Sequence, residues 1–154
     1  MGAITKGMMS SSRGDWETPK KLFDAVNEIW HFDLDAASSE ENALCDAHFT
    51  PQTDGLKQSW GGFRVWVNPP YGREIGAWVE KADRESQKPN TIVVMLLPAR
   101  TDTRWWQDHV IPHATEVAFI RGRLKFTLSG HPQGTAPFPS ALVRFGGALP
   151  TKVR

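Results

Sequence analysis

Two consecutive prolines constrain the fold of this chain more than any other feature of its sequence. They stand in the segment Asn68-Pro69-Pro70-Tyr71, directly after the apolar run of residues 63–67. Proline fixes its own φ, lacks a backbone N–H and restricts the residue before it, so neither a helix nor a strand continues through the pair. The sequence therefore predicts a buried strand that ends before Asn68 and a stiff loop at its carboxyl end.

This loop brings together groups that suit a planar ring with an exocyclic nitrogen. Asn68 supplies an amide, the prolines leave carbonyl oxygens free to accept, and Tyr71 supplies an aromatic face. A helix is expected from Ile75 to about Gln87, and ligands of open α/β sheets bind at the carboxyl ends of the strands. Asn-Pro is also common in ordinary turns and Tyr71 could be a core aromatic, so the motif alone leaves both interpretations open.

Hydrophobic periodicity predicts alternating strands and helices over the rest of the chain. Thr18 is expected to cap a helix that continues to Trp30, with Pro19 at its first position and an apolar face made of Leu22, Phe23, Val26, Ile29 and Trp30. Further helices are expected at 41–47, 75–87 and 103–111. Strands are expected at 32–36, 63–67, 91–97, 116–120, 123–126 and 140–145. This alternation predicts a compact α/β domain with a mostly parallel sheet and an antiparallel C-terminal edge.

Length and composition indicate one soluble, cytoplasmic domain. The chain has 154 residues, of which 1–14, with Gly, Met and a serine run, are expected to be a flexible leader before a domain at 15–154. The single cysteine, Cys45, cannot form an internal disulfide, which is typical of a reducing cytoplasm, and it is expected to be a buried residue on a helix face. The longest apolar run, residues 92–97, is too short to span a membrane.

Charge is distributed unevenly, although the net charge is only +1. Residues 1–99 contain 10 Lys and Arg against 14 Asp and Glu, which gives −4, whereas residues 100–154 contain 8 against 3, which gives +5. A basic C-terminal third favours contact with phosphate groups, and an acidic N-terminal part favours a cationic group. A solvated surface with chance asymmetry explains the same numbers.

Several other kinds of site are not indicated. Among the five histidines only His109 and His113 have a close metal-ligand spacing, and Pro112 is expected to break a helix between them, so no metal site is predicted. The sequence has no glycine-rich phosphate loop with its lysine and no serine in a nucleophile elbow. These absences argue against nucleotide hydrolysis and against acyl transfer through serine.

Six short motifs occur in an order that resembles a known family. They are Trp16-Glu17-Thr18-Pro19, Asp33-Leu34-Asp35-Ala36-Ala37, Asp54-Gly55-Leu56, Asn68-Pro69-Pro70-Tyr71, Leu97-Pro98-Ala99-Arg100-Thr101-Asp102-Thr103 and Gly122-Arg123-Leu124-Lys125-Phe126. Together they resemble the phage DNA N6-adenine methyltransferases of Dam-like type, from about Asp15 to Phe145. The resemblance implies a single-domain class I methyltransferase with a Rossmann-like fold, encoded by a phage or prophage and acting on double-stranded DNA in the bacterial cytoplasm. It implies neither a metal nor a membrane, and a monomer is favoured.

At the reacting centre, the resemblance implies methyl transfer from S-adenosyl-L-methionine to N6 of an adenine that is flipped out of the DNA helix. The N6 lone pair is delocalised into the purine ring, so acceptors on its N–H groups increase its nucleophilicity. The Asn68 side-chain oxygen and the Pro69 carbonyl are the expected acceptors, Pro70 stiffens the loop, and Tyr71 is expected to stack on the base. The sulfonium methyl group is already electrophilic, so alignment of donor and acceptor is the main requirement.

The cofactor is expected to contact a helix start and three carboxylates. The helix start, which suits the methionyl carboxylate, contains Trp16, Thr18 and Pro19. Asp33 and Asp35 suit the ammonium group, with Asp35 favoured, and Asp54 is the candidate for the ribose hydroxyls. Capping or solvent-facing roles remain open for these carboxylates. The glycine-rich turn common in methyltransferases is missing after Asp33, and the second strand of the class is expected to be degenerate.

DNA contacts are expected from loops, because no insertion is long enough to form a separate recognition domain. The candidate loops are 99–104, 122–125 and 129–139. The basic side chains in or beside them, which suit phosphate contacts or guanine readout, are Arg100, Arg104, Arg121, Arg123 and Lys125. Trp105 and Trp106 could stack on a base, but tryptophans of an amphipathic helix are more often core residues.

Two alternatives stay open at this point. The same Asn-Pro-Pro-Tyr loop also serves methylation of RNA bases or of protein glutamine, because these substrates share a planar nitrogen. The other alternative is a catalytically silent nucleic-acid-binding module that keeps the scaffold.

Overall fold

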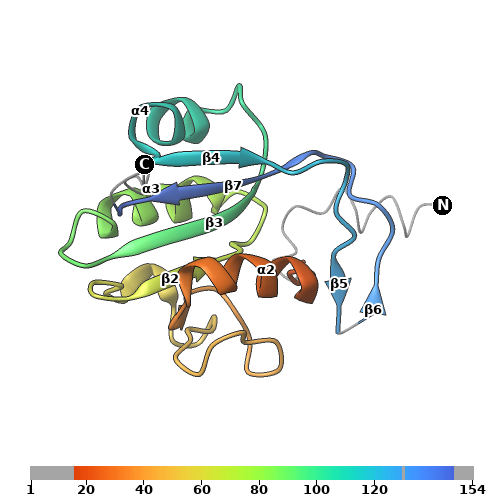
Figure 1. Ribbon diagram of the computed structural model, residues 1–154, viewed down its shortest axis with the longest axis horizontal. Coiled ribbons are helices and arrows are strands. Elements are labelled where there is room, and N and C mark those ends of the chain that lie inside the picture. Colours follow the sequence, from red (N-terminus) through yellow and green to blue (C-terminus); the bar gives the residue numbers. More distant parts are fainter. Residues whose placement is uncertain (1–15, 130, 148–154) are drawn as a thin grey trace, which may run out of the picture.

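The computed structural model describes residues 16–129 and 131–147, so the leader expected at residues 1–14 lies outside the described residues. A five-stranded sheet in the order β1-β2-β3-β7-β4 forms the centre of the molecule (Figure 1). Its strands are β1 (Leu34–Asp35), β2 (Arg64–Val67), β3 (Ile92–Pro98), β7 (Ser140–Phe145) and β4 (Glu116–Phe119). The mostly parallel α/β sheet is confirmed, since β1, β2 and β3 are parallel. The C-terminal strands form antiparallel pairs at one side of the sheet, where β7 lies between β3 and the edge strand β4.

Strand β3 lies at the centre of the core because both of its faces are covered. Its residues from Val93 to Pro98 are all buried, as expected for a continuous apolar run. Figure 1 shows helix α2 (Lys20–Trp30) in front of the sheet and helix α3 (Ile75–Glu85) behind it. Burial of apolar side chains between these layers holds the strands in place. Because β1, β2 and β3 are parallel, their carboxyl ends lie at the same end of the sheet.

Helix α2 packs an aromatic face against β2. Phe23 lies edge-on to Trp66, with ring centroids 5.4 Å apart, and Val26 is also buried. Ile29, which the periodicity assigns to the same face, is instead 69% exposed. A helix turns by about 100° per residue, which carries Ile29 to the border of the face that Phe23 and Val26 define.

The N-terminus of α2 also differs from the expectation. Pro19, not Thr18, occupies the N-cap position, and no side chain from the described part of the chain caps the helix. The Pro19 carbonyl accepts hydrogen bonds from the backbone N–H groups of Leu22 and Phe23, each at 3.1 Å. Thr18 therefore lies one residue too early to cap α2, and its hydroxyl contacts the loop after β2 instead.

The helix at residues 104–113 changes its hydrogen-bond pattern part-way. Its middle turn, η2 (Trp106–Val110), is a π-helix, and α4 (Ile111–His113) completes it. The N–H group of Ile111 donates to a carbonyl five residues earlier rather than four, which gives the wider turn that precedes Pro112. The expectation that Pro112 interrupts this helix is therefore wrong. Neither this helix nor any other within the described residues is both long and apolar enough to cross a lipid bilayer.

Residues 41–47 form turns instead of the expected helix. Polar side chains take the backbone groups that a helix would use: the Leu44 N–H donates to the Asp35 carboxylate, and the Asn42 N–H donates to the Ser39 hydroxyl. Cys45 is half-buried in these turns rather than on a helix face. Burial raises the pKa of Cys45 to about 12, so the thiol stays protonated and is a poor nucleophile at neutral pH.

Two expected strands are shorter or displaced. The segment 32–36 pairs as a strand only at Leu34–Asp35, and residues 123–126 form no strand. The chain instead forms a small separate sheet from β5 (Thr127–Leu128) and β6 (His131–Pro132), which projects from the main sheet (Figure 1). The hairpin lies against the start of the described chain, because Glu17 and Thr127 exchange two backbone hydrogen bonds.

Candidate active site

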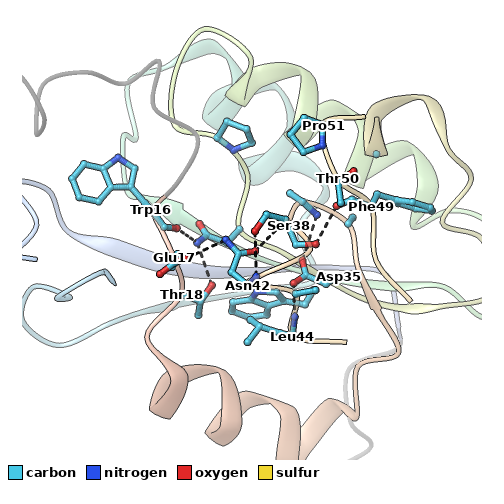
Figure 2. Close-up of a pocket in the computed structure, with 18 of the residues that line it drawn as sticks. Trp16, Glu17, Thr18, Asp35, Ser38, Asn42, Leu44, Phe49, Thr50 and Pro51 are labelled. Carbon is cyan, nitrogen blue, oxygen red and sulfur yellow. Dashed lines mark hydrogen bonds between the residues drawn. The ribbon is translucent and has the colours of Figure 1, made fainter. Parts of the chain in front are cut away.

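A large pocket opens at the carboxyl ends of β1 and β2. Its volume is about 1260 Å³, which is ample for a nucleoside-sized ligand. Figure 2 shows Trp16 on one side of the pocket, Phe49 and Pro51 on the other, and Ser38 and Asn42 between them. The lining side chains come from residues 16–18, 35–44, 49–56, 66–78 and 127–129. Segments far apart in the sequence therefore meet where open α/β sheets bind ligands.

Asn68 follows β2 directly, and its side-chain amide is fixed in orientation. Its Nδ2 donates hydrogen bonds to the backbone carbonyl of Trp16, at 2.6 Å, and to the hydroxyl of Thr18, at 3.1 Å. A carbonyl oxygen only accepts, so the amide nitrogen must face Trp16 and the amide oxygen must face away from it. Within the described residues, the buried Asn68 Oδ1 has no hydrogen-bond partner. A buried acceptor without a partner is unfavourable, and a donor on a bound ligand would satisfy it.

The rest of the Asn-Pro-Pro-Tyr loop is built around a buried tyrosine. Pro70 lines the pocket together with Asn68, whereas Pro69 is buried outside the lining. Tyr71 is only 1% exposed, and its hydroxyl donates to a backbone carbonyl of β3 at 2.9 Å. The rings that enclose it, both meeting it edge-on, are Phe126 and Phe138. Tyr71 therefore presents no open face in this structure, and its expected stacking on the base stays a prediction. Burial raises the pKa of Tyr71 well above its ordinary value, which keeps its hydroxyl protonated.

Asp35 is a buried carboxylate in the wall of the pocket. It is 3% exposed and accepts backbone hydrogen bonds from Leu44, at 3.0 Å, and Ala37, at 3.4 Å. Burial raises the pKa of Asp35 to about 6, against the lowering effects of these bonds and of His48. Asp35 is therefore ionised at neutral pH, yet none of the ion pairs among the described residues neutralises it. A cationic group on a ligand would favour its ionised form.

Asp54 reaches the pocket from a tight turn that requires a glycine. Its backbone is left-handed, with φ at 57°, and its carboxylate accepts the Leu56 N–H at 3.1 Å. At Gly55, a Cβ atom would lie 2.2 Å from the Ala36 carbonyl oxygen and 3.0 Å from the ring of Trp78. Gly55 therefore lets the Asp54 turn approach the residues after β1 closely.

The structure does not bring two of the expected cofactor residues into the pocket. Asp33 precedes β1, where its carboxylate accepts the Arg64 backbone N–H at 2.7 Å and pairs with the Arg64 guanidinium at 3.7 Å. Because β1 and β2 are parallel, this pair sits at their amino ends, whereas the pocket is at their carboxyl ends. Pro19 is the N-cap of α2 and lies outside the lining as well. The expected cofactor residues that do line the pocket are Trp16, Thr18, Asp35 and Asp54.

Glu17 connects three segments around the pocket, although the sequence did not single it out. Its backbone pairs with Thr127 in both directions, at 2.9 and 3.2 Å. Its carboxylate accepts the Thr127 hydroxyl at 3.1 Å and the Asn42 amide at 3.4 Å. These partners lie 110 and 25 residues away, so no local pattern could reveal them. The position of Glu17 between Trp16 and Thr18 is the only signal that the sequence offers.

Two buried tryptophans also border the pocket. Trp66 and Trp78 both line it, and within the described residues neither indole N–H has a hydrogen-bond partner. Buried indole N–H groups usually find an acceptor. Acceptor atoms on a ligand, such as ring nitrogens or carbonyl oxygens, would satisfy them.

The comparison with known proteins covers the same region. A family model described as DNA N-6-adenine-methyltransferase (Dam) matches residues 6–139. The chain belongs to this Dam family. A curated relative, the DNA N-6-adenine-methyltransferase of Escherichia phage T1, is 36% identical over 118 residues, which are 75% of this chain and 48% of the relative. The chain therefore spans about half the length of the curated relative that it matches.

The Dam family match includes every residue of the pocket wall, from Trp16 to Ser129, and ends directly before β7. It also includes the basic residues expected to contact DNA. These lie after β3 and in the segment after β4, two strands that run in the same direction because both are antiparallel to β7. Both segments therefore leave the sheet at the same edge as the pocket.

Most of these basic side chains reach solvent. Arg104, Arg121 and Lys125 are exposed, and Arg123 is exposed while its Nη1 donates to the Ala136 carbonyl at 3.4 Å. The Arg100 guanidinium lies 5.6 Å from the centroid of the Phe138 ring, one of the two rings that enclose Tyr71. Of the two tryptophans considered for stacking, Trp106 is 2% exposed and is a core residue.

Proposed function

We propose that this chain is an adenine-specific DNA methyltransferase, which transfers the methyl group of S-adenosyl-L-methionine to N6 of adenine in double-stranded DNA. Membership of the Dam family and the phage relative support this reaction class. The observation that carries the proposal is the Asn68 amide, whose buried oxygen has no partner within the described residues. Asn68 and Asp35 border the same pocket. Asn68 supplies an acceptor suited to an exocyclic N–H, and Asp35 supplies a carboxylate that no ion pair neutralises among the described residues.

In this proposal the Asn68 oxygen accepts one N–H of the adenine N6 group. This hydrogen bond increases the electron density on N6 and favours the tetrahedral geometry of a nucleophilic amine. The Pro69 carbonyl is the proposed second acceptor, and Pro70 keeps the loop rigid. Trp16 and Thr18 are positioning residues, because they hold the Asn68 amide through its nitrogen. No covalent bond between enzyme and base is required.

The residues of the pocket fit S-adenosyl-L-methionine. When bound, this cofactor supplies a sulfonium methyl group as the electrophile. We assign its ammonium group to Asp35, which is buried and ionised at neutral pH, and its ribose hydroxyls to Asp54. The indole N–H groups of Trp66 and Trp78 are the proposed donors to its purine ring, since neither has a partner within the described residues.

The sheet supports a compact Rossmann-like class I fold for the domain proposed at 15–154. The pocket lies at the carboxyl ends of parallel strands, as in other doubly wound sheets. Beside β1, His48 forms a single parallel bridge with Asp35. This bridge suits a second strand that has become degenerate. We further propose that the protein acts as a monomer in the cytoplasm of a phage-infected or lysogenic cell, which the phage origin of the relative supports.

The target base needs more room than the surroundings of Tyr71 provide. We place the adenine beside Asn68 and Pro70, which line the pocket. Stacking on Tyr71 requires the segment that carries Phe126 and Phe138 to move. Arg100 stacks on Phe138, so a phosphate that attracts Arg100 would also loosen this enclosure. The residues proposed for phosphate contacts are Arg100, Arg104, Arg121, Arg123 and Lys125.

Transfer of a labelled methyl group from S-adenosyl-L-methionine tests the proposed function. Unmethylated duplex DNA, structured RNA and protein are offered in parallel reactions. The protein is expected to label duplex DNA, and the Asn68→Ala variant is expected to leave it unlabelled. Label in RNA or protein alone would contradict the DNA proposal, and DNA binding without any transfer would identify a silent module.

A further inference from the structure

Three side chains outside the pocket converge on one point between two helices. Asp83 lies on α3, and His109 and His113 lie on the helix at 104–113. The Nδ1 atoms of His109 and His113 lie 2.8 and 2.7 Å from the same oxygen, Asp83 Oδ2. One potential ligand atom from each residue thus falls within 4.8 Å of the others.

The continuity of the helix through Pro112 explains how the two imidazoles come together. The helix continues through Pro112, so His109 and His113 lie four residues apart on a continuous helical segment. Side chains with this spacing lie on one face and can point to one acceptor. The same spacing is used by histidine pairs that bind a metal ion from a single helix.

Among the described residues, the Asp83 carboxylate forms no ion pair with a lysine or an arginine. Its side chain is 9% exposed, and its ion-pair partners among the described residues are the two histidines. The nearby lysines Lys81 and Lys88 pair instead with Glu85. Unlike a lysine or arginine side chain, an imidazole carries no permanent charge, so this largely buried carboxylate lacks a permanent counterion among the described residues. A metal cation would provide it.

The donor set selects the class of ion. Two imidazole nitrogens and one carboxylate oxygen suit Zn²⁺ and its neighbours Co²⁺ and Ni²⁺, whereas Mg²⁺ and Ca²⁺ prefer oxygen ligands alone. Ligand bonds of about 2.0–2.2 Å in a tetrahedron place ligand atoms about 3.3–3.6 Å apart. The histidine nitrogens are now 2.8 and 2.7 Å from Asp83 Oδ2, so small side-chain rotations suffice. Binding at Nδ1 moves the proton of each neutral ring to Nε2, so the total number of protons is unchanged.

We propose that Asp83, His109 and His113 form a binding site for Zn²⁺ or a similar divalent transition-metal ion, which clips α3 to the helix at 104–113. Three protein ligands leave a fourth position for water. None of the three residues lines the pocket, and Asp83 lies about 7.5 Å further along α3 than Trp78. The site therefore lies apart from the pocket proposed for methyl transfer. It holds in place the helix that directly follows the loop at 99–103.

Titration of the untagged, chelator-treated protein with Zn²⁺ alone, followed by calorimetry, tests the proposal. One ion per chain is expected to bind, with no response to Mg²⁺. Zn²⁺ at about a hundredfold excess over Kd is expected to raise Tm by roughly 5–10 °C. Titration with Co²⁺ is expected to give the visible absorption bands of a low-symmetry, four-coordinate ion.

Single substitutions separate this site from chance binding at other histidines. Each of three substitutions is expected to weaken Zn²⁺ binding by roughly tenfold or more: His113→Gln, His109→Gln and Asp83→Asn. A roughly tenfold loss is common even when the replaced residue only supports a metal ligand. His113 is the first choice because its side chain is 54% exposed, so its replacement should leave the fold intact, as thermal melting without metal will check. His48→Gln is the matched control, since His48 contacts a different carboxylate, Glu40. Absence of Zn²⁺ binding, or binding that persists equally in the folded His113→Gln and Asp83→Asn variants, would overturn the proposal.

Discussion

The backbone carbonyl of Trp16 accepts a hydrogen bond from the amide nitrogen of Asn68 at 2.6 Å, although the two residues are 52 positions apart in the sequence. Because this carbonyl cannot donate, it fixes which end of the amide is nitrogen. The oxygen is thereby left for a ligand. The segment before α2 thus sets the orientation of the group that we propose to act on adenine N6.

Replacement of Asn68 should separate methyl transfer from cofactor binding. Asn68→Ala removes the proposed acceptor of the N6–H, so kcat is expected to fall by at least about 100-fold, as for loss of other preorganised polar groups in active sites. Single-turnover methylation of duplex DNA measures this loss, and calorimetry with S-adenosyl-L-methionine is expected to give a nearly unchanged Kd.

Asn42→Ala is the matched control for this experiment. Asn42 lines the same pocket, but its amide donates to Glu17. This variant is expected to weaken cofactor binding and to keep methyl transfer at saturating cofactor. If Asn68→Ala instead loses cofactor affinity in proportion to activity, Asn68 contacts the cofactor and its role here is misassigned.

Thr18 is expected to act through Asn68 alone. Thr18→Val removes the hydroxyl that accepts a hydrogen bond from the Asn68 amide at 3.1 Å and leaves the contact with Trp16. The loss of one hydrogen bond is expected to lower kcat by roughly tenfold. Thr18→Ser keeps the hydroxyl and should restore most of the rate. Steady-state kinetics would speak against this role if Thr18→Val raised the KM for the cofactor and left kcat unchanged.

Cofactor affinity should depend on the ionisation of Asp35. The pKa of Asp35 is raised to about 6 by burial, and only the ionised carboxylate attracts the ammonium group. Affinity measured by calorimetry is therefore expected to rise between about pH 5 and pH 7 and to level off above that range. His48 lies beside Asp35 and also titrates, so the profile is repeated with His48→Gln, which should keep the rise. A flat profile in both proteins would rule out Asp35 as the ammonium partner.

The same shift predicts the sign of a stability effect. Folding raises the pKa of Asp35 from 3.8 to about 6, so its ionisation opposes folding. The contribution of Asp35 to the free energy of unfolding is therefore most favourable below about pH 4 and declines as the pH rises through about 6. The difference between the two pKa values corresponds to a total decline of about 3 kcal/mol in the free energy of unfolding.

Gly55 should be the most sensitive glycine of the pocket. Gly55→Ala would place a Cβ atom 2.2 Å from the Ala36 carbonyl oxygen, so the free energy of unfolding is expected to fall by about 2 kcal/mol or more. Gly134→Ala is the control, because a Cβ atom there meets no atom of the described residues within 4 Å. Urea denaturation of both variants gives the comparison. Equal stability of the two variants would show that the Asp54 turn relaxes freely.

The sequence predicts those parts of the fold in which local pattern and tertiary packing agree. The helix at 20–30 and the strand at 140–145 form at the expected residues, since their apolar spacing matches the faces that they bury. Strand β2 ends directly before Asn68, as expected from the two prolines that follow. The helix at 41–47 fails to form because the Asp35 carboxylate takes the Leu44 N–H, a contact that depends on the folded loop.

The candidate site shows the same limit. Asn68, Asp35 and Asp54 lie in short motifs of the sequence, and all three line the pocket, while their roles stay predictions. The enclosure of Tyr71 could not be predicted, since Phe126 and Phe138 reach it from the two sides of the β5–β6 hairpin, outside its strands. Asp33 and Asp35 are both candidates in the sequence, with Asp35 favoured, and the direction of β1 places Asp33 at the amino end, away from the pocket.

Analysis of the modified nucleoside tests the central claim most directly. Unmethylated duplex DNA is incubated with the protein and S-adenosyl-L-methionine, digested to nucleosides and examined by mass spectrometry. N6-methyldeoxyadenosine is the expected product, present with the wild-type protein and absent with Asn68→Ala. Methylated cytosine in place of methylated adenine, or N6-methyldeoxyadenosine formed equally by the Asn68→Ala variant, would contradict the proposed role of Asn68.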